Sequence, residues 1–250
     1  MPNLNNLTTQ DLQWGTANWS GQGYIDGLQM QWVSATALTV TSGAAFIPSL
    51  NKCLPVPNAI ALTGLVLAAS TFYHLYLYDN AGTPAIECVT TAPDAPYSGT
   101  ARAKTGDASR RYIGSVLTDA SANIYNFLQN NNLICYRVAN GVAPFRIVSG
   151  ANNSTAATAN ASSIVPSTSR IAILQLYNFD NTNGSNMATG TSDSPGTAIG
   201  NSGIYLVRAQ ATASVNHPLD SSQAMTYAFS APPLGTDGMF IDVFGYEYER

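Results

Sequence analysis

FYHLYLYDNAG, residues 72–82, opens the part of this sequence that decides its fold class. Successive side chains of an extended chain point to opposite faces, so Tyr73 and Leu75 share one face and His74 lies on the other. DNAG supplies turn residues, and AIECVT follows as a second strand. After a proline-rich passage and a basic segment, YIGSVLTDASANIYNF has the pattern of strand, polar turn and strand. Residues 72–128 therefore predict consecutive β-strands.

The strand pattern continues to the end of the sequence. Four later segments are rich in β-branched and aromatic residues and are separated by turn residues: SRIAILQLYNF, SGIYLVRAQATASV, QAMTYAFSA and GMFIDVFGYEYE. None has a helical period, so this half predicts an antiparallel β-sandwich. Alternation in the last segment predicts that one strand face carries Phe240, Asp242, Phe244, Tyr246 and Tyr248.

Length and composition predict an all-β chain of two β-sandwich domains in tandem. Residues 1–45 are interpreted as an extended N-terminal attachment arm with a first strand, and residues 46–150 as a β-rich module. Residues 151–163 carry no bulky side chain and are interpreted as a linker, with an exposed hairpin tip as the alternative. Residues 164–250 form the C-terminal sandwich. The apolar segment at residues 60–69 fits either a strand pair or one to two helical turns.

The composition favours a protein surrounded by other protein subunits. Charged residues make up 10% of the chain, compared with about a quarter in ordinary soluble domains. A formal net charge of −4 argues against a nucleic-acid partner, because binding phosphates requires a concentrated positive face. The longest apolar run is too short for a membrane helix, so we expect no membrane insertion. The N-terminus has no secretion-signal pattern, although a β-rich secreted protein remains the alternative.

A basic segment interrupts this low charge. It places four of the ten basic residues within ten positions: Arg102, Lys104, Arg110 and Arg111. The small polar residues between them predict a solvated loop or a salt-bridge patch between subunits. The alternative is an anion-binding site for lipopolysaccharide phosphates.

The usual chemical motifs are missing from the sequence. No common hydrolase, zinc or nucleotide-binding motif occurs, and we expect structural roles for His74 and His217. A glycosidase needs paired acids, and the possible ones lie near the end of the chain: Asp237, Asp242, Glu247 and Glu249. The internal repeats of polysaccharide-cleaving spikes are absent from the sequence. We therefore expect no catalytic residue and no cofactor.

Metal binding and disulfide bonds are not indicated either. The free cysteines predicted from an odd count without metal-ligand spacing are Cys53, Cys88 and Cys135. Calcium ligands could come from one loop, which holds Asp180, Asn181, Asn183 and Asp193. This loop lacks the residue order of an EF-hand, so a hydrated turn without metal is favoured.

The strand and turn order of residues 72–128 resembles a module of tail-fibre and other tail proteins of tailed bacteriophages. The resemblance is carried by the aromatic strand and by TTAP, PYSGT, RRYIGS and TDASANIYNF. It implies a non-enzymatic virion component, a tail-fibre or tail-tip protein assembled in the host cytoplasm. It further implies a homotrimer whose partners are other tail proteins and a glycan or protein receptor on the bacterial surface.

Three other functions stay open at this point. The chain could be a minor tail or baseplate scaffold protein without receptor contact, because it lacks a collagen-like or heptad shaft. It could also be a polysaccharide-cleaving enzyme similar to a tailspike. A carbohydrate-binding module of a secreted enzyme is the third, but that class would carry a signal peptide.

Two groups of residues are predicted to make contacts with partners. The first is the set of tryptophans, Trp14, Trp19 and Trp32, which either attach an N-terminal arm to the virion or pack on the chain's own first domain. The second surrounds the polar loop at residues 178–201 of the C-terminal half and would bind the receptor. Its members are Tyr177, Asn178, Phe179, Asp180 and Tyr205.

Overall fold

The computed structural model of this chain consists of β-strands and short 3-10 helices. It describes residues 20–139, 141–182, 184–192, 204–233 and 238–250. Within these residues the only helices are the 3-10 helices η2 (Ser20–Gly23) and η3 (Pro48–Leu50), and every strand pairing is antiparallel. The prediction of an all-β, antiparallel fold is confirmed.

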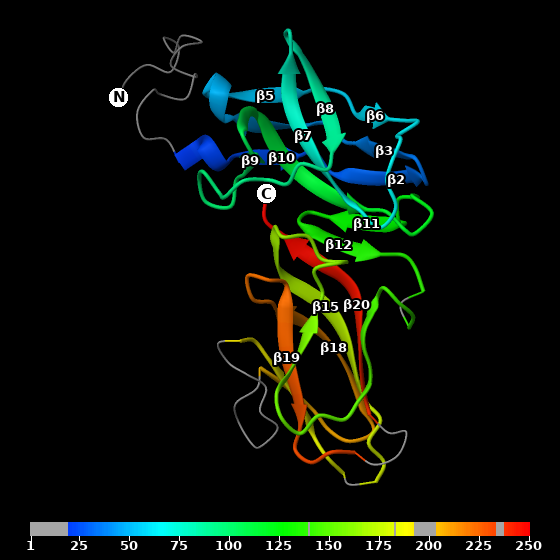
Figure 1. Cartoon of the computed structure of the whole chain (residues 1–250). Coiled ribbons are helices and arrows are strands. Elements are labelled where there is room, and N and C mark those ends of the chain that lie inside the picture. The colour runs from blue at the N-terminus through cyan, green and yellow to red at the C-terminus, as the bar shows by residue number, and fades with distance from the viewer. Residues whose placement is uncertain (1–19, 140, 183, 193–203, 234–237) are drawn as a thin grey trace, which may run out of the picture.

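Three sheets form the N-terminal half, the upper part of Figure 1. The first sheet has the order β1 (Ile25–Gly27), β4 (Gly43–Ile47), β5 (Lys52–Val56). The second has the order β2 (Met30–Ser34), β3 (Ala37–Val40), β6 (Ile60–Leu62). The third has the order β8 (Thr83–Val89), β7 (Phe72–Asn80), β10 (Asp107–Leu117), β9 (Ala103–Lys104). The strands predicted from residue 72 onward are therefore present, and the undecided segment at residues 60–69 contributes β6.

Two further sheets form the C-terminal half, the lower part of Figure 1. The long sheet has the order β11 (Phe127–Asn130), β12 (Leu133–Tyr136), β20 (Met239–Tyr248), β15 (Ser169–Asn178), β18 (Ala211–Pro218), and β13 (Arg146–Ala151) also pairs with β20. The facing sheet has the order β14 (Ala157–Asn160), β19 (Ala224–Phe229), β16 (Met187–Gly190), β17 (Tyr205–Val207). Buried side chains of both sheets belong to one hydrophobic cluster.

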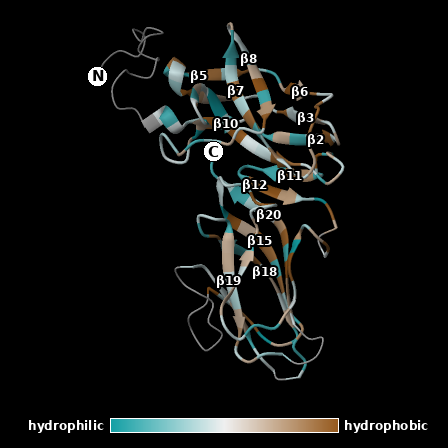
Figure 2. Cartoon of the chain, viewed as in Figure 1, coloured by the Kyte–Doolittle hydropathy of each residue, from teal (hydrophilic) through white to brown (hydrophobic). Residues whose placement is uncertain are grey.

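Strand β15 shows why one face of the long sheet points outward. Leu174 and Leu176 are buried, whereas Ile173, Gln175 and Tyr177 are only partly buried. This period of two places leucines in the core and leaves the alternate side chains on the opposite face. Figure 2 shows the same mixture of apolar and polar residues along the strands of both halves.

The side chains of β20 are arranged differently from the prediction, because the strand contains a bulge. Ile173 pairs with Gly245 and Leu174 pairs with Val243, so Phe244 is an extra residue in the strand. A one-residue bulge exchanges the two faces of a strand. The prediction of one shared face is therefore wrong. Before the bulge the outward residues are Phe240 and Asp242, and after it the inward residues are Tyr246 and Tyr248.

Residues 151–163, interpreted as a linker from the sequence, contribute a strand. Within them β14 pairs with β19 over four residues. Ala159 and Ala161 are buried, and the N–H of Phe229 donates to the carbonyl of Asn153. Pairing to an existing sheet orders a segment that lacks bulky side chains, a contribution that composition alone does not show.

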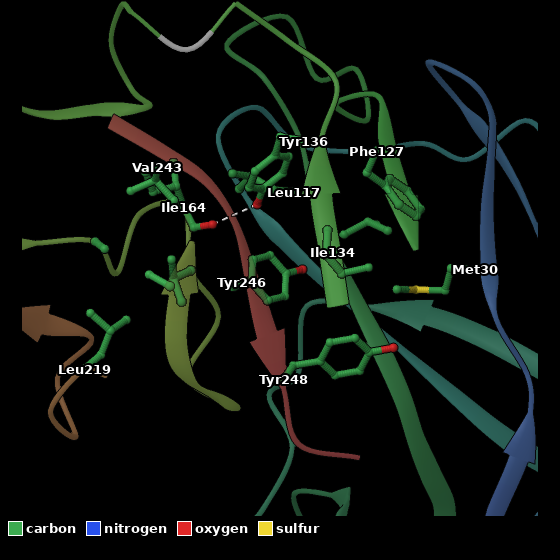
Figure 3. Packing of buried hydrophobic residues seen from close by; sticks show 14 of the residues in the cluster. Met30, Leu117, Phe127, Ile134, Tyr136, Ile164, Leu219, Val243, Tyr246 and Tyr248 are labelled. Atoms are coloured by element: carbon green, nitrogen blue, oxygen red, sulfur yellow. Dashed lines mark hydrogen bonds between the residues drawn. The ribbon is translucent and has the colours of Figure 1, made fainter. Parts of the chain in front are cut away.

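The two halves share one hydrophobic cluster (Figure 3). Tyr246 and Tyr248 extend from β20, and their hydroxyl groups donate to the carbonyls of Ser115 and Ile113 in β10 at 3.1 Å each. Both tyrosines are 1% exposed. The last strand of the chain is thus anchored inside the N-terminal half. The division into two tandem domains stays a prediction.

Candidate functional site

The outward face of the long sheet carries a polar row that crosses four strands. Ser214 of β18 pairs with Gln175 of β15, which pairs with Asp242 of β20, which pairs with Arg146 of β13. The Ser214 hydroxyl donates to Gln175 Oε1 at 2.7 Å. Directly opposed side chains on neighbouring strands lie close enough to interact, so pairing assembles this row.

Arg146 and Asp242 form the charged end of this row. Arg146 Nε and Nη2 donate to the two Asp242 carboxylate oxygens at 2.7 and 2.9 Å, and the Asp242 side chain is fully buried. The hydrogen bonds to Asp242 raise the pKa of Arg146. This bidentate geometry fixes the plane of the guanidinium group and leaves no net charge in the row.

Beside the polar row lies a group of three aromatic rings, Tyr177, Phe179 and Phe240, which we call the aromatic platform. Tyr177 and Phe240 are a direct cross-strand pair. The ring centroids of Tyr177 and Phe179 are 5.8 Å apart at an interplanar angle of 12°, and Phe179 meets Phe240 edge-on at 5.5 Å. Phe179 is 49% exposed. The platform thus combines rings of fixed orientation with an open surface.

The arginine of the polar row also supports the platform. The Arg146 guanidinium carbon lies 4.8 Å from the Phe240 ring centroid and 6.0 Å from that of Tyr177. A cation over an aromatic face is attracted by the ring quadrupole, which holds the ring in place. Burial raises the pKa of Tyr177, and the nearby Asp242 carboxylate raises it further, so the phenol stays neutral at physiological pH.

This arrangement suits a ligand with an apolar face and hydroxyl groups at its rim. Aromatic faces carry partial negative charge and attract weakly positive C–H groups. A sugar ring presents such C–H groups on one face and hydroxyls at its edge. The neighbouring amide of Gln175 and hydroxyl of Ser214 can exchange hydrogen bonds with such hydroxyls.

The structure separates the five residues predicted to bind a receptor. It brings Tyr177 and Phe179 together in the platform. Asn178 and Asp180 are fully buried instead, and the Asn178 amide donates to the carbonyls of Ser185 and Val207 at 2.8 and 3.0 Å. One carboxylate oxygen of Asp180 accepts the N–H of Ser185. These two residues hold the loop in place and are not available to a receptor.

Tyr205 lies on the facing sheet and contacts the edge of β18. Its hydroxyl donates to the carbonyl of Asn216 at 2.6 Å, and its ring packs against His217 at 5.5 Å. Tyr205 therefore belongs to the junction between the two sheets.

Of the three tryptophans, Trp32 belongs to the part of the chain that the structure describes. It lies in β2, is partly buried against the core, and its indole N–H donates to the carbonyl of Ile124 at 3.0 Å. This contact is with the chain's own N-terminal half. Trp14 and Trp19 lie outside the described residues.

Sequence reasoning missed Arg146, Gln175 and Phe240 as members of the site. Arg146 and Asp242 are separated by 96 positions, and only the pairing of β13 with β20 brings them together. Tyr177 and Phe179, by contrast, share a face because they lie two positions apart near the end of one strand. A local pattern could find the second pair but not the first.

A serine and a histidine meet in the core of the N-terminal half. His74 Nδ1 lies 2.7 Å from the Ser115 hydroxyl, and Tyr112 Oη lies 2.8 Å from the same hydroxyl. Burial lowers the pKa of His74 to about 4. His74 and Ser115 are 6% and 1% exposed, so a substrate cannot reach them. These buried hydrogen bonds therefore support the fold of the N-terminal half.

The remaining candidate groups also have structural partners. Burial lowers the pKa of His217, whose Nε2 lies 3.0 Å from the Thr189 hydroxyl. Glu249 binds Arg102 at 2.7 Å. Within the described ranges no three His, Cys, Asp or Glu side chains gather as a metal site, and the three cysteines are free. Of the proposed calcium ligands, Asn183 and Asp193 lie outside those ranges.

The basic segment is not the solvated loop that the sequence predicts. Lys104 Nζ and Arg110 Nε both lie near the Glu87 carboxylate, at 2.9 and 3.4 Å. Arg111 is fully buried, donates to backbone carbonyls that include Gly23, and has its pKa lowered by burial. These side chains form contacts within one chain, because β8, β9 and β10 belong to the same sheet and Gly23 of the N-terminal segment lies next to Arg111.

Comparisons with known proteins do not assign this chain to a family. No protein-family model matches the sequence, and no curated protein matches it. Among the described residues no helix is long and apolar enough to cross a membrane.

Proposed function

We propose that this chain is a non-enzymatic component of a tailed-bacteriophage virion, a tail-fibre or tail-tip protein that binds a glycan on the host surface through its aromatic platform. The observation that carries the proposal is the exposed Phe179 ring, set beside Tyr177 and Phe240 and next to a neutral polar row. Rigid aromatic side chains supply much of the contact energy at binding surfaces.

Two features of the sequence support the virion part of this proposal. Residues 72–128 resemble a module of phage tail proteins, and only 10% of the residues are charged. We propose other tail proteins as further partners, assembly in the host cytoplasm, and a homo-oligomer. Binding, and not cleavage, is favoured because Asp242 is held by Arg146 and the His74 and Ser115 pair is buried.

The platform is tested by binding of the purified protein to surface polysaccharide extracted from the host bacterium. We expect Phe179→Ala to weaken binding about tenfold, since stacking on one ring contributes on the order of 1.4 kcal/mol. Leu206→Ala is the matched control, because Leu206 is also an exposed apolar residue of this half but lies on β17 of the facing sheet. Equal loss in both variants, or loss in neither, would contradict the assignment of the platform.

A further inference from the structure

β18 is an unusual edge strand among those that the structure describes. Every other sheet-end strand in these residues is five residues long or shorter, apart from β8, which contains Pro84 and Glu87. β13 is interrupted by two register shifts. β18 has eight residues, no charged side chain, no proline before Pro218 and no bulge. Short length, charged side chains, proline and bulges protect the edge strands of soluble proteins, so their absence leaves this edge open to pairing.

The backbone of β18 offers hydrogen-bonding groups on its outer side. The N–H of Leu219 donates to the carbonyl of Arg170, which makes Ile171 and Pro218 a pair without direct hydrogen bonds. By the alternation of an antiparallel ladder, Thr212 and Ser214 then turn their N–H and C=O groups away from β15. Both residues are exposed.

Tyr205 limits the length of this open edge. Its hydroxyl donates to the carbonyl of Asn216 at 2.6 Å, which shows that Asn216 also faces away from β15. The Tyr205 ring therefore covers one end of β18. The other end is closed by the turn in which the N–H of Ala211 donates to the carbonyl of Arg208. Thr212 to Ser214 remains as the centre of the open edge.

We propose that this edge pairs antiparallel with the same edge of a second copy of this chain. With Ala213 on the two-fold axis, Thr212 of each copy lies opposite Ser214 of the other, and the two pairs exchange four backbone hydrogen bonds. A second copy fits because the strand is uncharged and meets no like charge on self-pairing. Small hydroxyl side chains also face one another without a clash.

The pairing does not depend on the proposed glycan binding, but it has a consequence for it. A two-fold axis perpendicular to the long sheet joins two copies into one continuous sheet. Both aromatic platforms then lie on the same face, because rotation about this axis does not exchange the faces of the sheet. Both also lie near the junction, since Tyr177 and Thr212 are cross-strand neighbours. Two linked sites bind a repetitive polymer more tightly than one site does.

Light scattering with size-exclusion chromatography tests the pairing, at protein concentrations up to on the order of 100 µM. We expect the wild-type chain to have an even number of copies, with twice the chain mass of 26.3 kDa as the smallest form. Thr212→Lys places a charge at the edge, and Ser214→Pro removes an outward N–H without affecting the β15 ladder. Each substitution is expected to raise the dissociation constant of the dimer at least tenfold and to leave the circular dichroism spectrum unchanged.

Thr158→Lys is the matched control, because Thr158 is exposed on β14, the edge of the facing sheet. It is expected to leave the mass unchanged. The proposal is overturned if the wild-type chain is a monomer or a trimer. It is also overturned if folded Thr212→Lys and Ser214→Pro proteins keep the wild-type mass, or if Thr158→Lys dissociates the dimer equally. A wild-type dimer that does not bind the glycan would count against the platform alone.

Discussion

Asp242 illustrates how single residues obtain their roles from pairing in this protein. The sequence makes it a candidate catalytic acid, but both of its carboxylate oxygens accept hydrogen bonds from Arg146. A fully buried carboxylate is costly without a partner, so the pair is best understood as a support for the neighbouring rings. The same pair sets the orientation of Phe240 through the guanidinium group.

We predict that Asp242→Asn lowers the free energy of unfolding by about 1 to 3 kcal/mol, because a buried hydrogen bond to a charged group is weakened. Urea denaturation measures this change. Glu247→Gln is the control, since Glu247 is exposed on the same strand, and we expect a change within about 0.5 kcal/mol. An equal effect of the two substitutions would show that the ion pair contributes nothing beyond a surface charge.

A second prediction at this scale concerns pH. The folded-state pKa of His74 is about 4, below the unfolded value of 6.5, because burial disfavours its charged form. The neutral His74 therefore contributes fully to the free energy of unfolding above pH 6.5. This contribution is lost as the pH falls toward 4, by roughly 3 kcal/mol in total. His74→Gln should reduce the slope of stability against pH between pH 6.5 and 4. His217→Gln should remove a separate part of that slope, since burial also lowers the pKa of His217.

Urea midpoints at several pH values measure both effects. A His74→Gln protein that keeps the wild-type slope would show that His74 does not stay neutral in the folded chain.

The positions of the strands could be predicted from the sequence more fully than the faces of their side chains or their pairing partners. Alternation and turn residues located β7, β15 and β20 because a half-buried strand has a period of two. The bulge at Phe244 could not be predicted, because an inserted residue depends on the partner strand. β14 was missed for a similar reason, since its small residues are ordered by β19. Two of the three platform residues, Tyr177 and Phe179, could be found because they lie two positions apart at the end of β15.

The bulged strand gives a prediction at the scale of elements. A Cβ atom on Gly245 would lie 2.0 Å from the carbonyl oxygen of Ile134, closer than any side chain tolerates. We expect Gly245→Ala to force β20 away from β12 and to lower stability by at least about 3 kcal/mol, or to prevent folding. Gly141→Ala is the control, because its nearest neighbour is the Arg146 Nη2 atom at 3.5 Å. Thermal unfolding of the two proteins should differ clearly, and similar midpoints would contradict the observed pairing of β12 and β20.

At the scale of the whole molecule, β20 connects the two halves through buried hydrogen bonds. Tyr248 donates to the carbonyl of Ile113 and accepts from Gln129 Nε2 at 2.8 Å. Arg250 adds a bond from its guanidinium group to the carbonyl of Leu28. These contacts favour cooperative unfolding of the two halves.

We predict that Tyr248→Phe lowers the stability of both halves together, by about 1 to 3 kcal/mol, because the buried Ile113 carbonyl and the partly buried Gln129 amide each lose a hydrogen bond. Trp32 is partly buried in the N-terminal half, so its fluorescence reports on that half, while circular dichroism follows the whole chain. The two signals should give coincident midpoints in wild type and variant. Tyr205→Phe, which removes a bond at an exposed site, should have a smaller effect. Separate transitions would show that the halves unfold independently.

The central claim is that this chain is a receptor-binding component of a phage tail. Electron microscopy of particles from a producing culture, labelled with an antibody against the purified protein, tests this claim most directly. The account predicts label at the distal end of the tail, and loss of particle adsorption when the same antibody is bound. Label that is absent from intact particles and present only in the surrounding medium would contradict it.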